Sequence, residues 1–212
     1  MRRHDLFHLL PAGWAALLDL PWDAQAQACL RHWCDHDLPL VVSRQACVAA
    51  PDAVALGLPA PACWSRRRLA LQLPVAQLGR AARLPGLDAV VALLDPAERP
   101  AGYRLADALA GASASVRVAG SYGWQRLTGL DYLRPGSDLD LLVEVADAAS
   151  ARAAADLLSA YDPRGAGTGT RLDGELIFPS GGAVAWREWS AAEQVLVKRL
   201  GGVALEPRAA LA

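Results

Sequence analysis

Two aspartates, Asp138 and Asp140, enclose a leucine at the start of the mostly apolar segment Leu139–Val145, and this pattern restricts the fold strongly. A short segment with apolar residues on both faces is typical of a buried central strand. Residues two apart on a strand project to one face, so both carboxylates point one way while Leu139 packs inward. At a separation of about 6 Å the two charges repel by roughly 3 kcal/mol at an effective dielectric near 20. Mg²⁺ between them would relieve this repulsion, because it prefers carboxylate oxygens and substrate phosphates.

Taken alone, an Asp-x-Asp pair is a weak signal, and a solvated strand end is the alternative interpretation. A chain with 22 acidic residues should contain about two acid-x-acid triplets by chance. The context upstream favours a site, because Gly120-Ser121 lies between an expected strand, Ser115–Ala119, and an expected short helix, Tyr122–Gly129. Glycine permits close approach of the backbone to a phosphate, and a helix start offers unpaired N–H donors. Ser121 could also cap the helix, and the two roles are compatible.

A third carboxylate is expected downstream, on the predicted strand Arg171–Phe178. Asp173 and Glu175 share one face of it, and either could bind metal or accept the proton of an attacking hydroxyl. Asp173 is the better candidate and Glu175 the alternative. The predicted catalytic and metal-binding residues are therefore Asp138, Asp140 and Asp173. The predicted phosphate-binding residues are Gly120, Ser121, Arg126 and Arg134.

The predicted fold class is α+β. A chain of 212 residues can form one large domain or two small ones with real cores. We expect a small N-terminal α/β domain over residues 1–80 and a catalytic domain over 81–212, whose mixed sheet is flanked by helices. The expected helices are 22–36, 87–94, 101–110, 122–129, 148–161 and 190–200; the expected strands are 40–44, 54–58, 68–73, 115–119, 139–145, 171–178 and 183–186, with a flexible loop over 164–170.

Composition and charge exclude several classes of protein. The formal net charge of −1 gives no support to sequence-independent binding of nucleic acid, which normally requires a basic excess. Pro, Arg or Asp interrupts every apolar stretch, so neither a membrane span nor a secretory signal is expected. Four cysteines are too few for a disulfide scaffold in a chain of this size, which favours reduced thiols and a cytoplasmic location.

Three further groups of residues each have a functional and a structural interpretation. The basic triplet Arg66–Arg68 could bind phosphates or an acidic protein, although charge runs are usually solvated surface. On a helix Cys29, His32 and His36 would share one face, but Cys34 would not; zinc sites use better-separated pairs, so packing is favoured. Tryptophans near the expected site could stack on a base or serve the core. These are Trp124, Trp186 and Trp189.

The order of the predicted site residues resembles a known superfamily. Gly120-Ser121, then Asp138-Leu-Asp140, then Arg171-Leu-Asp173 is similar to the pattern of polymerase-beta-like nucleotidyltransferases. Sixteen residues separate Ser121 from Asp138, a longer gap than that superfamily usually shows.

A narrower resemblance covers most of the chain, which is similar to members of the phosphoribosyl-dephospho-CoA transferase family. It is carried by the segments Arg3–Leu6, Ala55–Pro59, Arg66–Leu71, Gly120–Gln125, Arg134–Leu142, Asp173–Leu176 and Ala183–Glu188. The resemblance implies triphosphoribosyl-dephospho-CoA as donor and a serine of the apo acyl-carrier subunit of malonate decarboxylase as acceptor. It also implies pyrophosphate as the second product. Mg²⁺ on the aspartates would suit this chemistry.

Two alternatives stay open at this point. The chain could be a nucleotidyltransferase that uses an ordinary nucleoside triphosphate on a protein or small molecule. It could instead be a non-catalytic module that binds a carrier protein or a nucleotide. The second alternative predicts that function survives the loss of Asp138 and Asp140, whereas both enzyme hypotheses require them.

Overall fold

The computed structural model describes residues 1–211 except 46–47, 49, 113–114 and 162–168. Contacts divide the chain into two compact units. Unit 1 comprises Met1–Arg83 with Leu200–Gly202, and unit 2 comprises Leu84–Arg199 with Val203–Ala212. Each unit has its own sheet and helices, so the predicted α+β class with two domains is confirmed.

Unit 1 is built on a five-stranded antiparallel sheet with strand order β4-β3-β2-β1-β5. Strands β3 and β4 bury alternate residues, as expected when one face of a sheet covers a core. Buried leucines of the two helices, Leu17 and Leu30, belong to the core of this unit. The elements are β1 (Leu6–Leu9), α1 (Pro11–Leu18), α2 (Ala24–Asp35), β2 (Leu40–Val42), β3 (Ala53–Pro59), η1 (Ala62–Trp64), β4 (Arg68–Pro74), η2 (Val75–Gln77) and β5 (Leu78–Ala82).

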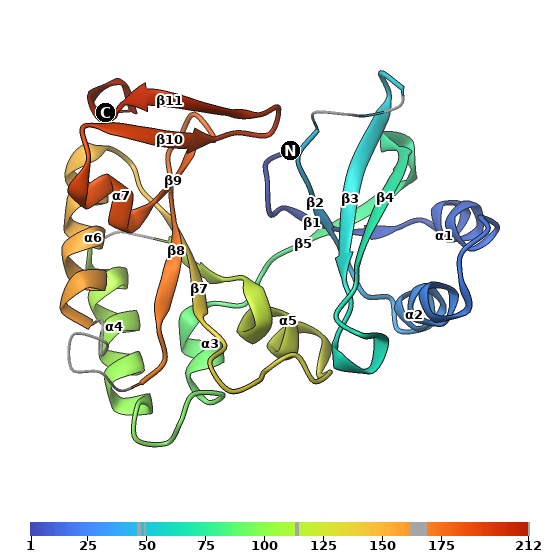
Figure 1. The fold of residues 1–212 in the computed structure, drawn as a ribbon, viewed down its shortest axis with the longest axis horizontal. Helices are drawn as coiled ribbons and strands as arrows, with labels where there is room; N and C mark the ends of the chain where they lie inside the picture. The colour runs from blue at the N-terminus through green and yellow to red at the C-terminus, as the bar shows by residue number, and fades with distance from the viewer. Residues whose placement is uncertain (46–47, 49, 113–114, 162–168, 212) are drawn as a thin grey trace. The chain divides into compact units, whose positions relative to one another are not determined.

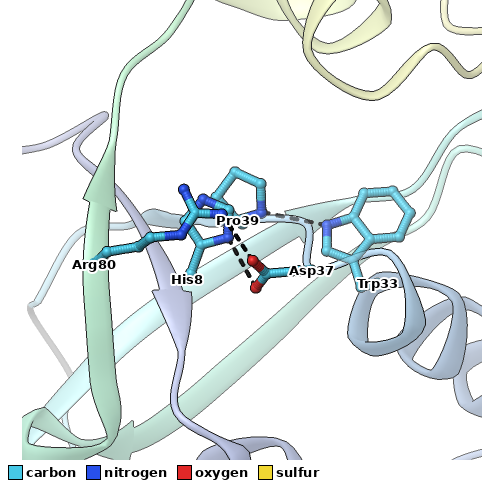
Figure 2. A network of polar contacts seen from close by, with 5 residues as sticks. All are labelled: His8, Trp33, Asp37, Pro39 and Arg80. Atoms are coloured by element: carbon cyan, nitrogen blue, oxygen red, sulfur yellow. Dashed lines mark hydrogen bonds and ion pairs between the residues drawn. The ribbon is translucent and has the colours of Figure 1, made fainter.

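A polar network fixes the turn after α2, and Figure 2 shows its residues. Asp37 lies between His8 and Arg80: its Oδ1 is 3.1 Å from His8 Nδ1, and its Oδ2 accepts from Arg80 at 2.7 Å. The Arg80 hydrogen bond is the main cause that lowers the pKa of Asp37. Trp33 Nε1 donates to the Pro39 carbonyl at 3.3 Å. These bonds join the turn after α2 to β1 and β5.

Unit 2 is built on a six-stranded mixed sheet with strand order β11-β10-β9-β8-β7-β6. Strands β7 and β8 are parallel and are connected through α6, while the other pairs are antiparallel. Helices α4 and α6 lie side by side along one face of this sheet (Figure 1). The elements are α3 (Leu87–Val91), α4 (Arg99–Gly111), β6 (Ser115–Val118), α5 (Gly120–Thr128), β7 (Leu139–Glu144), α6 (Ala148–Tyr161), β8 (Leu172–Ile177), β9 (Ala183–Ala185), α7 (Trp186–Ala191), β10 (Gln194–Lys198), β11 (Val203–Pro207) and η4 (Arg208–Leu211).

Strand β7 divides its residues between the two faces of the sheet as predicted. Leu139, Leu141 and Val143 are buried in the core that includes residues of α3, α4, α6 and α7. Asp140 is half-buried on the opposite face, at the amino end of the strand. The core therefore fixes the direction in which the Asp140 carboxylate points.

The helix predicted over Ser190–Leu200 is wrong. Helix α7 ends at Ala191, and residues Gln194–Lys198 form strand β10, which pairs with β11 along its whole length. Val195 and Val197 are fully buried and alternate with more exposed neighbours, which is the two-residue period of a strand. The Ser190–Glu193 spacing suggested a capping box, but the Ser190 hydroxyl bonds to the Trp186 carbonyl instead.

Two further expectations concern the loop over 164–170 and membrane-spanning helices. Of the loop expected over 164–170, residues 164–168 fall outside the described residues. In the described ranges no helix is long and apolar enough to cross a bilayer.

Candidate active site

The parallel pairing of β7 with β8 brings the predicted carboxylates to one end of the sheet. Asp140 is the direct register partner of Asp173, one strand spacing away. Asp138 immediately precedes β7, and the next residue, Leu139, donates its N–H to the Arg171 carbonyl at 2.8 Å. Asp138, Asp140 and Asp173 therefore gather at the amino ends of two neighbouring strands.

The pKa of Asp140 is raised by burial and, in part, because the other two aspartates lie nearby. Burial is the largest cause, followed by the charges of Asp173 and Asp138, and together they raise the pKa of Asp140 from 3.8 to about 6. Arg171 acts in the opposite direction. The two neighbouring aspartates therefore act electrostatically on the same carboxyl, as expected for a site that holds a cation.

The start of α5 lies against Asp140. Gly120 is the first residue of the helix and has a φ of +57°, in the left-handed region that favours glycine. A Cβ atom at this position would overlap the Asp140 Oδ2 atom and lie 2.7 Å from its Cγ. Ala119 N–H donates to the Asp140 carbonyl at 2.9 Å. The structure thus places Gly120 directly beside the Asp140 carboxylate, and Ser121 is the next residue in the first turn.

Two cations near the carboxylates were missing from the predicted site. Arg171 Nη1 is 3.5 Å from Asp138 Oδ2, and Lys198 Nζ donates to Glu175 Oε1 at 2.7 Å. Arg171 had a sequence signal, because it occupies the first position of the Arg-Leu-Asp triplet that ends in Asp173. Lys198 had none, because the incorrect helix prediction removed it from the sheet.

The same contacts distinguish the two candidates for the third carboxylate. Glu175 is 12% exposed and already has an ion pair with Lys198. Asp173 lies opposite Asp140, and its Oδ1 accepts from the adjacent Gly174 N–H at 2.9 Å. The geometry therefore favours Asp173 as the partner of the aspartate pair, and Glu175 as a carboxylate balanced by a lysine.

The two predicted phosphate-binding arginines lie in different places. Arg126 is in the last turn of α5, about 9 Å along the helix axis from Gly120. Its Nε donates to the Ala89 carbonyl at 3.1 Å. Arg134 is exposed in the turn that leads to Asp138, where its N–H donates to Ser137 Oγ at 3.0 Å. Of the two, Arg134 has the closer connection to the aspartates.

The tryptophans that could have stacked on a ligand are buried. Trp186 and Trp189 are 3% and 4% exposed and belong to the core of unit 2. Trp124 is also buried, and its ring stacks with that of Tyr132 at 6.4 Å between centroids. Their burial supports the packing interpretation.

Packing contacts are found for Cys29 and His32 of α2 and for His36, which follows the helix. The His32 and His36 rings stack with centroids 4.0 Å apart. Cys29 is buried, and burial raises the pKa of its thiol to about 12. In the basic triplet, Arg67 pairs with Asp23 at 2.7 Å. The contacts of the histidines and Cys29 agree with the packing interpretation. Arg67 is partly exposed and forms an ion pair with Asp23.

The donor atoms at the end of β7 and β8 suit Mg²⁺ that enters together with a polyphosphate. Within the part of the chain that the structure describes, no three or more His, Cys, Asp or Glu side chains are already arranged to hold a metal ion. Mg²⁺ is commonly held by one or two carboxylates plus substrate phosphates rather than by a cage of protein ligands. Asp138 and Asp140 can supply those carboxylates, and the glycine at the start of α5 lets the first turn of that helix approach the Asp140 carboxylate closely.

Comparison with known proteins assigns the family. The family model described as "Phosphoribosyl-dephospho-CoA transferase MdcG C-terminal domain" matches residues 77–209, and the corresponding N-terminal domain model matches residues 2–83. The chain belongs to the phosphoribosyl-dephospho-CoA transferase family. It is accordingly a transferase enzyme.

Curated relatives of this family match nearly the whole chain. A phosphoribosyl-dephospho-CoA transferase of Xanthomonas euvesicatoria pv. vesicatoria (strain 85-10) is 41% identical over 208 residues, which cover 94% of this chain and 96% of the relative. One from Bradyrhizobium diazoefficiens is 36% identical over 217 residues, covering 97% and 90%. One from Pseudomonas putida (strain W619) is 32% identical over 213 residues, covering 95% and 91%. No solved structure matches the chain significantly.

Proposed function

We propose that this transferase attaches the prosthetic group of malonate decarboxylase to its apo acyl-carrier subunit. The donor is triphosphoribosyl-dephospho-CoA. The serine oxygen of the carrier forms a bond to the α-phosphorus, the bond from that phosphorus to the pyrophosphate oxygen breaks, and the serine proton passes to a base. The observation that carries the proposal is the convergence of Asp138, Asp140 and Asp173 with the start of α5 at the amino ends of β7 and β8.

The residues divide the work according to their positions. Asp138 and Asp140 would hold Mg²⁺, which when bound neutralises charge on the triphosphate and pyrophosphate. Gly120 and Ser121 bring the N–H groups of the first turn of α5 to the phosphates. Asp173 accepts the serine proton or completes the metal site. Arg134 and Arg171 supply positive charge for the donor, and Arg171 lies beside Asp138 in this structure.

The proposed reaction takes place in the cytoplasm. Cys29, Cys34 and Cys63 are free thiols, a state that persists in reducing compartments. The proposed partners are the apo carrier subunit and the donor, without nucleic acid or membrane.

The two carboxylates of β8 should differ in importance. Asp173→Asn is expected to lower kcat by roughly 100-fold or more, because it removes the charge opposite Asp140. Glu175→Gln should keep kcat within roughly tenfold of the wild type, since Glu175 is already paired with Lys198. Steady-state transfer rates of both variants measure the difference. A greater loss for Glu175→Gln would reverse the assignment of the third carboxylate.

Binding of the metal with the donor should stabilise the wild-type protein and not a variant without the aspartate pair. At a concentration of 100 times the Kd, a ligand that binds only the folded state adds about 2.7 kcal/mol to the free energy of unfolding. The Tm of the wild type is therefore expected to rise when MgCl₂ and the donor are both added. The double variant Asp138→Asn with Asp140→Asn should show no such rise, and equal shifts in both proteins would contradict a metal at this pair.

The reaction itself is tested by mass spectrometry of the apo carrier subunit after incubation with enzyme, MgCl₂ and donor. The expected result is a mass increase equal to one phosphoribosyl-dephospho-CoA group on the serine, with release of pyrophosphate. A parallel incubation replaces the donor with ATP. Transfer from ATP alone would establish the nucleoside triphosphate alternative. Loss of both aspartates without loss of function in a cell that depends on the carrier would favour a non-catalytic module.

A further inference from the structure

Thr170, one residue before Arg171, makes a polar network with two other elements of unit 2. Its N–H donates to Glu98 Oε1 at 2.6 Å, and its hydroxyl donates to Glu98 Oε2 at 2.7 Å. The Tyr122 hydroxyl is 3.4 Å from Thr170 Oγ1. The threonine hydroxyl has one proton and donates it to Glu98, so Tyr122 is left as the donor to Thr170. The hydrogen bonds therefore run in one direction, from Tyr122 through Thr170 to Glu98.

Both partners of Thr170 are held by their own elements. Glu98 occupies the N-cap position of α4, where the helix dipole favours a carboxylate, and its carbonyl accepts from Gly102 N–H at 2.9 Å; its side chain makes no capping hydrogen bond. Tyr122 is buried in the first turn of α5, two residues after Gly120. Hydrogen bonds to a charged group are stronger than those between neutral groups. Thr170 is thus held by the start of α4 through Glu98 and by the first turn of α5 through Tyr122.

The network reaches the candidate active site from both sides. On the strand side, the Arg171 carbonyl accepts from Leu139 N–H, the Arg171 side chain contacts Asp138, and Asp173 follows two residues later. On the helix side, Tyr122 belongs to the same turn as Gly120, which lies against Asp140.

We infer that Glu98, Thr170 and Tyr122 form a positioning network that holds the start of α5 and the strand bearing Asp173 in one arrangement. None of the three needs to touch the donor, so they act through Gly120, Arg171 and Asp173. The inference rests on the proposed function, because the network serves the in-line geometry of that transfer. A displacement of about 1 Å between reacting groups can reduce a rate by roughly 100-fold.

Two substitutions at Thr170 isolate the hydroxyl. Thr170→Val keeps the β-branched shape and the backbone N–H but removes the hydroxyl, whereas Thr170→Ser keeps the hydroxyl and the backbone N–H and loses only the methyl group. Thr170→Val is expected to lower kcat about tenfold or more while the KM for the donor changes less than about threefold. Thr170→Ser should restore kcat to within about twofold of the wild type. Wild-type kcat in Thr170→Val would overturn the inference.

A matched control separates positioning from general stability. Ser150 caps α6 by accepting from the N–H groups of Ala146 and Asp147 at 3.0 Å, and it lies past the opposite end of β7. Ser150→Ala removes a comparable number of hydrogen bonds from the same unit. Its kcat is expected to equal that of the wild type even where its Tm matches that of Thr170→Val. An equal loss of kcat in Ser150→Ala would show that the effect of Thr170→Val is merely structural.

Amide hydrogen exchange tests the network without any substrate. In the free protein, a peptide spanning residues 169–173 is expected to exchange faster in Thr170→Val and Glu98→Ala than in the wild type, and unchanged in Ser150→Ala. If this result is obtained while the wild type transfers nothing to the carrier, the network stands and the proposed function fails. If the wild type is active but exchange in Thr170→Val is unchanged, the network inference fails alone.

Discussion

Replacing Asp140 by asparagine is expected to abolish transfer and to stabilise the protein in the absence of metal. The change removes one of the two carboxylates proposed to hold Mg²⁺, so kcat should fall by roughly 100-fold or more. It also removes a charge that burial, Asp173 and Asp138 disfavour, since these raise the pKa of Asp140 from 3.8 to about 6. A shift of about two units corresponds to at most about 3 kcal/mol, and solvent screening at this half-buried group reduces it to about 1–2 kcal/mol.

The gain in stability has a definite pH dependence. Between pH 3.8 and about 6 the folded protein retains a proton on Asp140 that the unfolded chain has released. The free energy of unfolding of the wild type therefore falls as the pH rises through this window and stays lower above it. The asparagine variant lacks this change. Its Tm, measured with EDTA present, should exceed that of the wild type by several degrees above pH 6, and the difference should vanish toward pH 4.

Asp147 provides the control for this experiment. Its pKa is lowered by hydrogen bonds from Ser150, so its charge is favoured in the folded state. Asp147→Asn should therefore bring no increase in Tm above pH 6, and transfer should remain at the wild-type rate. An Asp140→Asn protein that melts below the wild type above pH 6 would contradict the electrostatic account. One that keeps wild-type activity would remove Asp140 from the proposed site.

The sequence was sufficient for the part of the site that depends on local pattern. The Asp138-Leu-Asp140 spacing determined which face each side chain takes, because strand geometry alternates regardless of the neighbours. It could not show that Asp173 lies opposite Asp140, since strand register depends on pairing between distant segments. The ion pair between Lys198 and Glu175 could not be predicted from the sequence for the same reason, because it joins two distant segments.

The errors in the predicted strands have one cause. In the segment Gln194–Lys198 the two-residue period was present, but a local capping pattern and the helix propensity of nearby alanines suggested a helix. The segment is a strand because β11 pairs with it and its valines are buried, which are tertiary effects. Strand β1 and strand β5 were likewise missed: each is short, and each is stabilised by pairing with the other.

Gly120→Ala is expected to eliminate most of the activity, because a single methyl group cannot be accommodated there. The Cβ atom would overlap Asp140 Oδ2, so either the carboxylate or the first turn of α5 must move. Both are proposed to contact the metal-bound donor, and a displacement of about 1 Å is enough to reduce kcat by roughly 100-fold. The φ of +57° adds strain of roughly 1 kcal/mol for a residue other than glycine, which should lower the Tm as well.

Gly129→Ala separates the overlap from the backbone strain. Gly129 ends the same helix with a φ of +73°, but a Cβ atom there would meet nothing within 4 Å. It should therefore lower the Tm by a similar amount through strain alone and keep kcat within about threefold of the wild type. Equal losses of kcat in the two variants would mean that helix strain, and not contact with Asp140, limits the reaction. The added methyl group must displace either the Asp140 carboxylate or the start of α5. Full activity in Gly120→Ala would therefore show that the start of α5 is not beside the reacting phosphates.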